Sequence, residues 1–171
     1  MAATAPRMCE VLDCSQLSAA PSKTRQKSVL LIEDSEDAML LVKYALQEYG
    51  RGKYRLIWAT NLIRGLEQLG SGEIDVVLLD LGLPESSGSV TYAWVREIAP
   101  EVPAIVLTAD DSEETEFSVL AGGAADYLHK ALASGSLLIE AIQAAMSTSK
   151  ARQQTSTAPG QVVHRFRWKL A

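Results

Sequence analysis

The chain has 171 residues, of which 47% are apolar and 22% are charged. This length and composition fit one globular domain of ordinary size with tails, and exclude a collagen-like, disulfide-scaffold or wholly disordered chain. No stretch approaches the ~20 unbroken apolar residues of a transmembrane helix. The net charge of −5 is uneven: residues 1–27 carry +2, residues 28–150 carry −11 and residues 151–171 carry +4. An acidic middle therefore lies between two basic ends.

Residues 1–27 are predicted to form a flexible N-terminal tail, because no hydrophobic period persists among their many Ala, Ser, Thr and Pro residues. No secretory signal is expected, since Arg7 is followed by Met8, Cys9 and Glu10 rather than by an apolar run. Cys9 and Cys14 are too few for a disulfide framework. Reduced thiols and a cytoplasmic location are the resulting expectation.

Residues 28–150 alternate between apolar runs of strand length and segments with helical spacing. Five strands are predicted, at Val29–Ile32, Tyr54–Ala59, Ile74–Leu79, Ala104–Leu107 and Ala125–Leu128. Five helices are predicted, at Glu36–Tyr49, Leu62–Leu69, Val90–Ile98, Glu113–Ala121 and Leu137–Ser147. This alternation is typical of an α/β protein with a parallel sheet and helices on both faces.

Local signals mark several of the helix ends. Asn61 is a predicted N-cap of the second helix and Gly70 its end. Pro100 follows the third helix, and Asp111 and Glu114 have capping-box spacing before the fourth. The apolar face predicted for the first helix consists of Leu41, Val42, Ala45, Leu46 and Tyr49.

Polar residues follow four of the five predicted strands: Glu33 and Asp34 the first, Asp80 the third, Thr108 the fourth and Lys130 the fifth. Ligands of such sheets bind outside the carboxyl ends of the strands, so we expect these side chains to converge. Neighbouring carboxylates repel one another unless a cation joins them, and Mg²⁺, or Mn²⁺ in its place, suits an oxygen site. A carboxylate can also accept a phosphoryl group, with a lysine and a hydroxyl to contact the phosphoryl oxygens.

Four segments carry a family resemblance, namely Leu30–Asp34, Asp80–Gly88, Val106–Ala109 and Asp126–Lys130. In this order they resemble the receiver domain of two-component response regulators, and the resemblance covers residues 28–150. It implies a flavodoxin-like (βα)5 fold whose five parallel strands have the order 2-1-3-4-5. It also implies phosphotransfer from a histidine kinase or a histidine phosphotransfer protein to an aspartate, which by motif is Asp80.

The resemblance assigns a metal site as well. Glu33 and Asp34 match the acidic pair that holds Mg²⁺ together with Asp80, and Asp34 is the expected direct ligand of the two. Gly82 stands where a backbone carbonyl completes the metal shell.

The remaining assignments concern catalysis and switching. Lys130 matches the phosphate-contacting lysine, and Thr108 the switch hydroxyl. Tyr127 matches the aromatic rotamer switch, and the small Ala109 leaves backbone room beside the phosphoryl group. The chain is therefore expected to be a phosphoacceptor signalling domain that catalyses only its own phosphotransfer and dephosphorylation, and not an enzyme in the usual sense.

One position departs from the family pattern. Family members usually have proline after the lysine, whereas Ala131 follows Lys130 here. A cis peptide at a non-proline residue costs about 2.5–4 kcal/mol, so a trans peptide is expected. The segment Ala131–Ser136, where kinases of this family commonly dock, is therefore expected to differ from that of other family members. The choice of partner is expected to differ with it.

Output is expected through protein–protein contacts. Because 21 residues follow Lys150, a stand-alone receiver without direct DNA binding is predicted. Lys130 is the only Lys or Arg between residues 112 and 149, which excludes the paired charges through which many regulators dimerise. Ile139, Gln143 and Met146 are predicted to form an apolar partner surface instead. Basic and apolar residues alternate at 165–170, which predicts a strand at 162–170 in the basic C-terminal tail, a second route to a homodimer.

Three other functions fit the sequence less well. A pseudo-receiver that only binds partners does not need Asp80, Thr108 and Lys130. The presence of all three in this chain argues against that function. A phosphatase of the aspartate-nucleophile class places a second acid two residues after the nucleophile, where this chain has Gly82. A flavodoxin needs hydroxyl residues after the first strand, and the acids between residues 33 and 37 would repel its phosphate.

Overall fold

The computed structural model describes residues 25–86, 88–109, 112–131 and 133–155. The strands within these residues are β1 (Lys27–Ile32), β2 (Tyr54–Ala59), β3 (Val76–Asp80), β4 (Ala104–Thr108) and β5 (Asp126–His129). The helices are α1 (Glu36–Glu48), α2 (Leu62–Gly70), α3 (Ser89–Ile98), α4 (Glu113–Ala121) and α5 (Gly135–Thr155). Each corresponds to a predicted element, and the alternating α/β architecture is confirmed.

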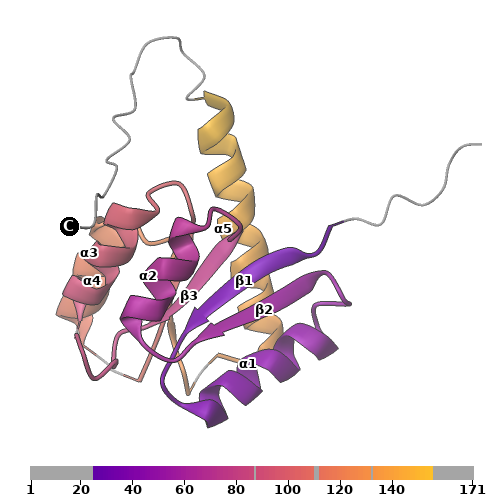
Figure 1. The fold of residues 1–171 in the computed structure, drawn as a ribbon, viewed down its shortest axis with the longest axis horizontal. Coiled ribbons are helices and arrows are strands. Elements are labelled where there is room, and N and C mark those ends of the chain that lie inside the picture. The colour runs from indigo at the N-terminus through magenta and orange to yellow at the C-terminus, as the bar shows by residue number, and fades with distance from the viewer. Residues whose placement is uncertain (1–24, 87, 110–111, 132, 156–171) are drawn as a thin grey trace, which may run out of the picture.

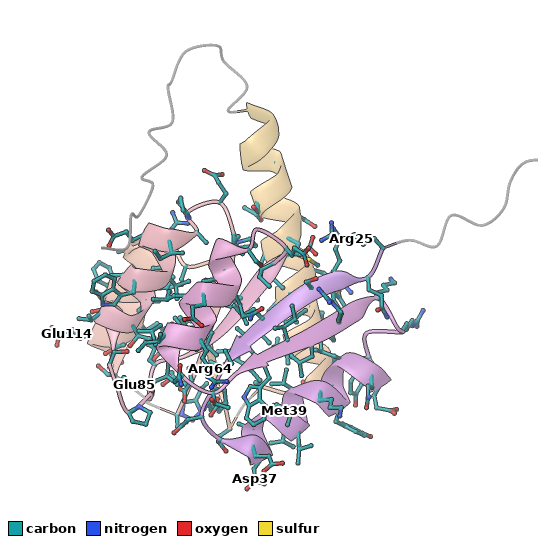
Figure 2. The ribbon with its side chains drawn as sticks, in the orientation of Figure 1. Arg25, Asp37, Met39, Arg64, Glu85 and Glu114 are labelled. Atoms are coloured by element: carbon teal, nitrogen blue, oxygen red, sulfur yellow. The ribbon has the colours of Figure 1, made fainter. Side chains whose placement is uncertain are left out.

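The five strands form one parallel sheet in the order β2-β1-β3-β4-β5, as the flavodoxin-like prediction required. Helices α1 and α5 cover one face, and α2, α3 and α4 cover the other (Figure 1). Parallel strands bring their carboxyl ends to one edge. Asp37, Arg64 and Glu85, which follow three of these ends, lie at that side of the molecule, away from Arg25 (Figure 2).

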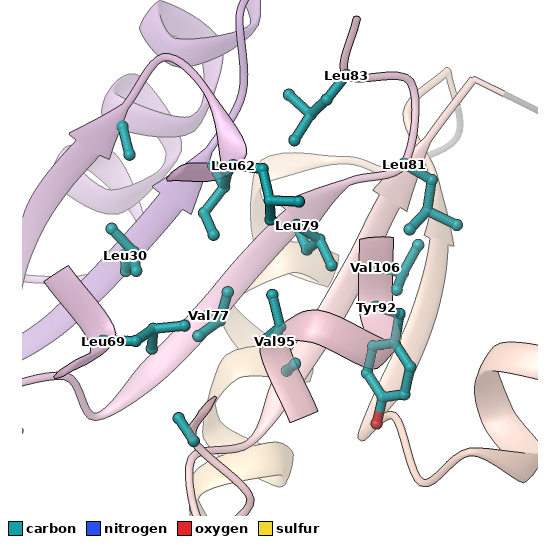
Figure 3. Packing of buried hydrophobic residues seen from close by; sticks show 14 of the residues in the cluster. Leu30, Leu62, Leu69, Val77, Leu79, Leu81, Leu83, Tyr92, Val95 and Val106 are labelled. Carbon is teal, nitrogen blue, oxygen red and sulfur yellow. The ribbon is translucent and has the colours of Figure 1, made fainter. Parts of the chain in front are cut away.

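Strand β1 divides the hydrophobic interior into two cores, because successive strand side chains point to opposite faces. Leu30 and Ile32 pack with residues of α2, α3 and α4, whereas Val29 and Leu31 pack with residues of α1 and α5. Figure 3 shows the first core, in which side chains of α2 and α3 meet those of β3. Strands β3 and β4 are buried along their whole length, which explains their unbroken apolar sequences.

Side-chain caps begin four of the helices, including α5, where the Leu137 amide donates to the Ser134 hydroxyl at 3.3 Å. The carboxamide of Asn61 accepts a hydrogen bond from the Arg64 amide at 2.9 Å, which confirms the predicted N-cap. Ser35 caps α1 in the same way, and Ser112 caps α4, while the predicted capping residue Asp111 lies outside the described residues. Helix α2 includes Gly70 and turns away only at Gly72, whose φ of +74° suits glycine.

Helix α5 begins at Gly135 and runs to Thr155, past residue 150, whereas the sequence predicted an end at Ser147. Hydroxyl side chains account for the difference. Ser147 and Thr148 donate to the carbonyl oxygens of Gln143 and Ala144, one turn back, so they do not compete with the helical backbone. Ser149 donates at 2.9 Å to the carbonyl of Glu101 in the loop before β4, which attaches this part of α5 to the domain.

Two predicted helix faces were partly wrong. On α1 only Val42, Ala45 and Leu46 of the predicted set are buried, while Leu41 is 72% exposed and Tyr49, just after the helix, is 51% exposed. The face of α1 that is buried against the sheet is therefore narrower than the distribution of its apolar residues suggests.

The apolar partner surface predicted on α5 is not present in the structure. Ile139 is only 4% exposed and belongs to the core, and Met146 packs partly against the same core. Gln143 is exposed. These three residues therefore do not make a free apolar stripe, because the sheet uses two of them.

The strand predicted at 162–170 and the two cysteines lie outside the described residues. Among the residues that are described, none of the helices is both long and apolar enough to cross a membrane.

Candidate functional site

The candidate site is organised around one lysine. The Nζ atom of Lys130, just after β5, lies 2.6 Å from Oε2 of Glu33 and 2.9 Å from Oδ2 of Asp80. Glu33 follows β1 and Asp80 ends β3, so three strand ends meet at this ammonium group. Both carboxylates are buried, and the lysine side chain is partly exposed. The predicted convergence of these three side chains is present in the structure.

Burial and neighbouring charges shift the pKa values of Glu33 and Lys130. Burial raises the pKa of the Glu33 carboxyl; the hydrogen bond from Lys130 lowers it in part, and the charge of Asp80 raises it further. For Lys130, burial alone would lower the pKa, but the two carboxylates outweigh it and the pKa is raised. The lysine is therefore held as a cation at neutral pH.

Backbone contacts fix Glu33 at the end of β1. Its amide donates to the carbonyl of Ala59 at 3.0 Å, which continues the ladder with β2 by one residue. Its own carbonyl accepts a hydrogen bond of 2.8 Å from the indole Nε1 of Trp58, and the Ser35 amide donates to its carboxylate at 3.3 Å. The acidic turn after β1 is thus attached to β2 on one side and to α1 on the other.

Asp34 completes an acidic cluster with its two neighbours. One carboxylate oxygen from each of Glu33, Asp34 and Asp80 lies within 4.8 Å of the others. Asp34 is exposed, which leaves one side of the cluster open to water. Three hard oxygen donors with a single ammonium group leave an excess of negative charge, and this donor set fits Mg²⁺ or Mn²⁺.

The loop after β3 approaches the same aspartate. The amide of Gly82 donates to Oδ1 of Asp80 at 3.1 Å, while Lys130 contacts Oδ2, so the two carboxylate oxygens are held by different groups. A Cβ atom at Gly82 would lie 3.5 Å from Asp80 Oδ2, which is ordinary contact, so the position does not require glycine for space.

Thr108, Ala109 and Tyr127 lie on the neighbouring strands. Thr108 ends β4 and is buried, and its carbonyl accepts from the Lys130 amide at 2.8 Å. Ala109 follows it and is exposed. Tyr127 is half-buried and packs against the core beneath α2, α3 and α4. Thr108 and Tyr127 therefore lie on β4 and β5, the two strands that follow β3 in the sheet, and Tyr127 faces the core on the side of α2, α3 and α4.

Two side chains at this edge were not assigned a role from the sequence. Trp58 reaches the acidic turn because β2 lies beside β1 in register, with Leu31 opposite Trp58. His129 hydrogen-bonds to backbone atoms of Ala109 and Ala131, which directly follow Thr108 and Lys130. Nothing in the sequence pattern marked either residue, since their roles depend on which strands are neighbours.

Comparison with known families decides the classification. The model of the response regulator receiver domain matches residues 29–143 of the chain. This chain belongs to the response regulator receiver domain family. The matched residues include every strand end that contributes to the site, so the fold and the resemblance read from the motifs are both confirmed.

The receiver is similar to several bacterial regulators. It is 33% identical over 136 residues to the KDP operon transcriptional regulatory protein KdpE of Escherichia coli (strain K12), covering 80% of this chain and 56% of KdpE. It is 35% identical over 107 residues to the swarming motility regulation protein RssB of Serratia marcescens, covering 62% of this chain and 47% of RssB. The chain thus spans about half the length of these relatives.

Solved structures agree on the fold. A CheY-like receiver domain from Methanospirillum hungatei JF-1 matches the receiver with a TM-score of 0.66 and 22% identity, covering 74% of this chain and 98% of that one. A response regulator from Burkholderia pseudomallei, solved with a phosphorylated aspartic acid, a calcium ion and citrate, matches with a TM-score of 0.59 and 25% identity. That match covers 78% of this chain and 76% of the other.

Proposed function

We propose that this receiver accepts a phosphoryl group on Asp80 from a histidine kinase or a histidine phosphotransfer protein, with Mg²⁺ or Mn²⁺, and signals through protein–protein contacts. The observation that carries the proposal is the buried arrangement in which Lys130 lies 2.9 Å from the Asp80 carboxylate, beside Glu33 and Asp34. This arrangement offers a carboxylate nucleophile, a fixed cation and a set of metal ligands within one edge of the sheet.

In the proposed step, a carboxylate oxygen of Asp80 attacks the phosphorus of a phosphohistidine. The bond between phosphorus and the imidazole nitrogen breaks, the electron pair stays with that nitrogen, and an acyl phosphate forms on Asp80. The Gly82 amide and the Lys130 ammonium orient the carboxylate before attack. Lys130 then contacts a phosphoryl oxygen, where its charge stabilises the transition state.

The acidic cluster is proposed to hold the metal through the carboxylates of Asp34 and Asp80 and the backbone carbonyl of Gly82, with Glu33 in a supporting position. A Mg²⁺ ion held there would supply positive charge to the phosphoryl oxygens. Glu33 is already committed to Lys130 at 2.6 Å, so its proposed task is to hold the lysine as much as the ion.

Switching is proposed to involve the next two strands. Thr108 supplies a hydroxyl to the phosphoryl oxygens, Ala109 leaves space beside them, and Tyr127 responds by changing its packing. The support for this is positional: Thr108 and Tyr127 lie on paired strands, with Val106 opposite Tyr127 in the register of β4 and β5. The phosphorylated aspartic acid in the Burkholderia pseudomallei regulator supports the chemistry by similarity.

The test is incubation with a small phosphodonor and Mg²⁺, followed by intact mass measurement. We expect one phosphoryl group on the wild-type protein, none on Asp80→Asn, and an unchanged adduct on Asp75→Asn, a control aspartate at the opposite end of β3. Omitting the divalent cation or replacing Asp34 by Asn should slow the reaction strongly. An unmodified wild-type protein, or an undiminished adduct on Asp80→Asn, would instead favour the pseudo-receiver, which only binds partners.

A further inference from the structure

The imidazole of His129 joins the segments that follow β4 and β5. Its Nε2 atom lies 3.2 Å from the carbonyl oxygen of Ala109, and its Nδ1 atom accepts a hydrogen bond of 3.2 Å from the amide of Ala131. Ala109 directly follows Thr108, and Ala131 directly follows Lys130. One side chain therefore bonds to the residues just beyond two of the proposed site residues.

These contacts lie where the sheet ends. Thr108 and His129 are register partners, and the Lys130 amide donates to the Thr108 carbonyl at 2.8 Å, which is a ladder bond one residue further on. The carbonyl of His129 accepts from the Ala133 amide at 3.0 Å and so begins the turn toward α5. The imidazole adds two hydrogen bonds at the point where the pairing of β4 and β5 ends.

The two contacts define one form of the ring. Because the Ala131 amide donates to Nδ1, that nitrogen carries no proton, and Nε2 carries the proton that it donates to Ala109. A doubly protonated ring would set its Nδ1–H against the Ala131 N–H. The bridge consequently requires the neutral Nε2–H tautomer.

The residue after the lysine makes this bridge available. Proline at that position would have no N–H to donate, whereas Ala131 has one. Here the amide of Ala131 is satisfied by its neighbour two positions back, so the turn after Lys130 is held by a side-chain contact.

We propose that His129 is a positioning residue for phosphotransfer: as the neutral Nε2–H tautomer it holds the backbone just after Thr108 and just after Lys130, and thereby the place of Lys130 beside Asp80. This inference rests on the proposed phosphoacceptor function. The two hydrogen bonds of the imidazole described above go to backbone atoms of Ala109 and Ala131 rather than to the carboxylate of Asp80. His129 acts through Lys130, whose Nζ position relative to Asp80 depends on where its backbone is held.

The test compares three variants of the full chain. His129→Phe keeps a flat ring and removes both bonds, His129→Asn keeps an acceptor near the position of Nδ1, and His129→Gln keeps a donor near the position of Nε2. His164→Phe, the same change at the other histidine of the chain, is the matched control. The measurements are the rate constant of phosphorylation by a small phosphodonor with Mg²⁺, and the imidazole ¹⁵N chemical shifts and Ala131 amide exchange by NMR.

We expect His129→Phe to lower the rate constant about tenfold, which corresponds to about 1.4 kcal/mol in the barrier. His129→Asn and His129→Gln should each restore part of the rate, and His164→Phe should not change it. The wild-type ring should show a protonated Nε2 and an unprotonated Nδ1, and the Ala131 amide should exchange faster in His129→Phe but not in His129→Asn.

The outcomes separate the two proposals. A wild-type protein that is phosphorylated at the same rate as folded His129→Phe would overturn the positioning role and leave the phosphoacceptor function standing. An Nδ1–H tautomer in the wild-type protein would also overturn the positioning role. A wild-type protein that takes no phosphoryl group would overturn the proposed function and, with it, the role of His129 in that function.

Discussion

The indole of Trp58 donates a hydrogen bond of 2.8 Å to the backbone carbonyl of Glu33. This bond ties an aromatic ring near the end of β2 directly to the acidic turn that is proposed to bind the metal. Trp94, in contrast, lies in α3, away from the end of β1, and is exposed. These two of the three tryptophans in the chain therefore differ in what they can report.

We predict that Mg²⁺ changes the fluorescence of Trp58, because an ion bound beside Glu33 and Asp34 alters the field at the indole ring. Titration of the wild-type protein should give a saturable change in emission. Trp94→Phe should retain that change and Trp58→Phe should lose it. A change that survives in Trp58→Phe would show that the signal comes from elsewhere.

The second prediction concerns the charge balance of the site. Replacing Lys130 by Ala leaves the buried carboxylates of Glu33 and Asp80 without their cation, so the free energy of unfolding should fall by about 2 kcal/mol. Mg²⁺ should raise the melting temperature of Lys130→Ala more than that of the wild-type protein, since a divalent ion replaces the lost charge. Lys43→Ala, at an exposed position of α1, is the control and should change neither quantity.

The third prediction uses a close approach between α2 and β1. A Cβ atom at Gly65 would lie 2.4 Å from Cδ1 of Ile32, whereas one at Gly70 of the same helix would meet nothing within 4 Å. Gly65→Ala should therefore destabilise the domain by about 1–3 kcal/mol through overpacking. Gly70→Ala should be neutral or stabilising, because alanine favours helices.

Urea unfolding of the two glycine variants measures the difference, and Ile32→Val in the Gly65→Ala background should recover part of the loss by removing the methyl group in question. Equal stabilities of Gly65→Ala and Gly70→Ala would contradict the packing of α2 on β1.

The fourth prediction concerns acid. Asp75 forms an ion pair of 2.7 Å with Lys27 and accepts from the Ser28 amide at 2.8 Å. Burial opposes ionisation of Asp75, but these hydrogen bonds outweigh it and lower the pKa of the carboxyl. A lowered folded-state pKa contributes stability that is present above the ordinary value, about 3.9, and is lost as pH falls through the folded-state value.

Asp75→Asn should therefore lower the free energy of unfolding by about 1 kcal/mol at pH 7. The difference from the wild-type protein should shrink as the pH is lowered from 5 toward 2. Urea unfolding across this range measures it, and a difference that stays constant with pH would show that the ion pair contributes nothing.

The sequence predicted the site better than it predicted the edges of the helices. The convergence of Glu33, Asp80 and Lys130 follows from the parallel arrangement alone, because each residue ends or follows a strand and parallel strands end at one edge. The roles of Trp58 and His129 depend instead on which strand lies beside which, and in what register. Local sequence carries no signal for that relationship.

The length of α5 shows a second limit. Ser147, Thr148 and Ser149 favour helix ends when they are read alone, since their hydroxyls compete for backbone groups. In the structure two of these hydroxyls bond to carbonyls one turn back, and Ser149 bonds to Glu101. Hydrogen bonds within the helix and to Glu101 thus outweigh the local preference of these residues for a helix end.

The alternation of β1 has a consequence for how the chain folds. Glu33 continues the odd-numbered series of Val29 and Leu31, and lines a cavity of about 230 Å³ together with Leu107 and Lys130 on the α1 and α5 side. A slip of one residue in β1 would exchange the two cores and, in the same movement, turn the carboxylate away from the lysine. Chains paired out of register would thus lack the site, so the proposed phosphorylation of Asp80 would also report on correct strand pairing.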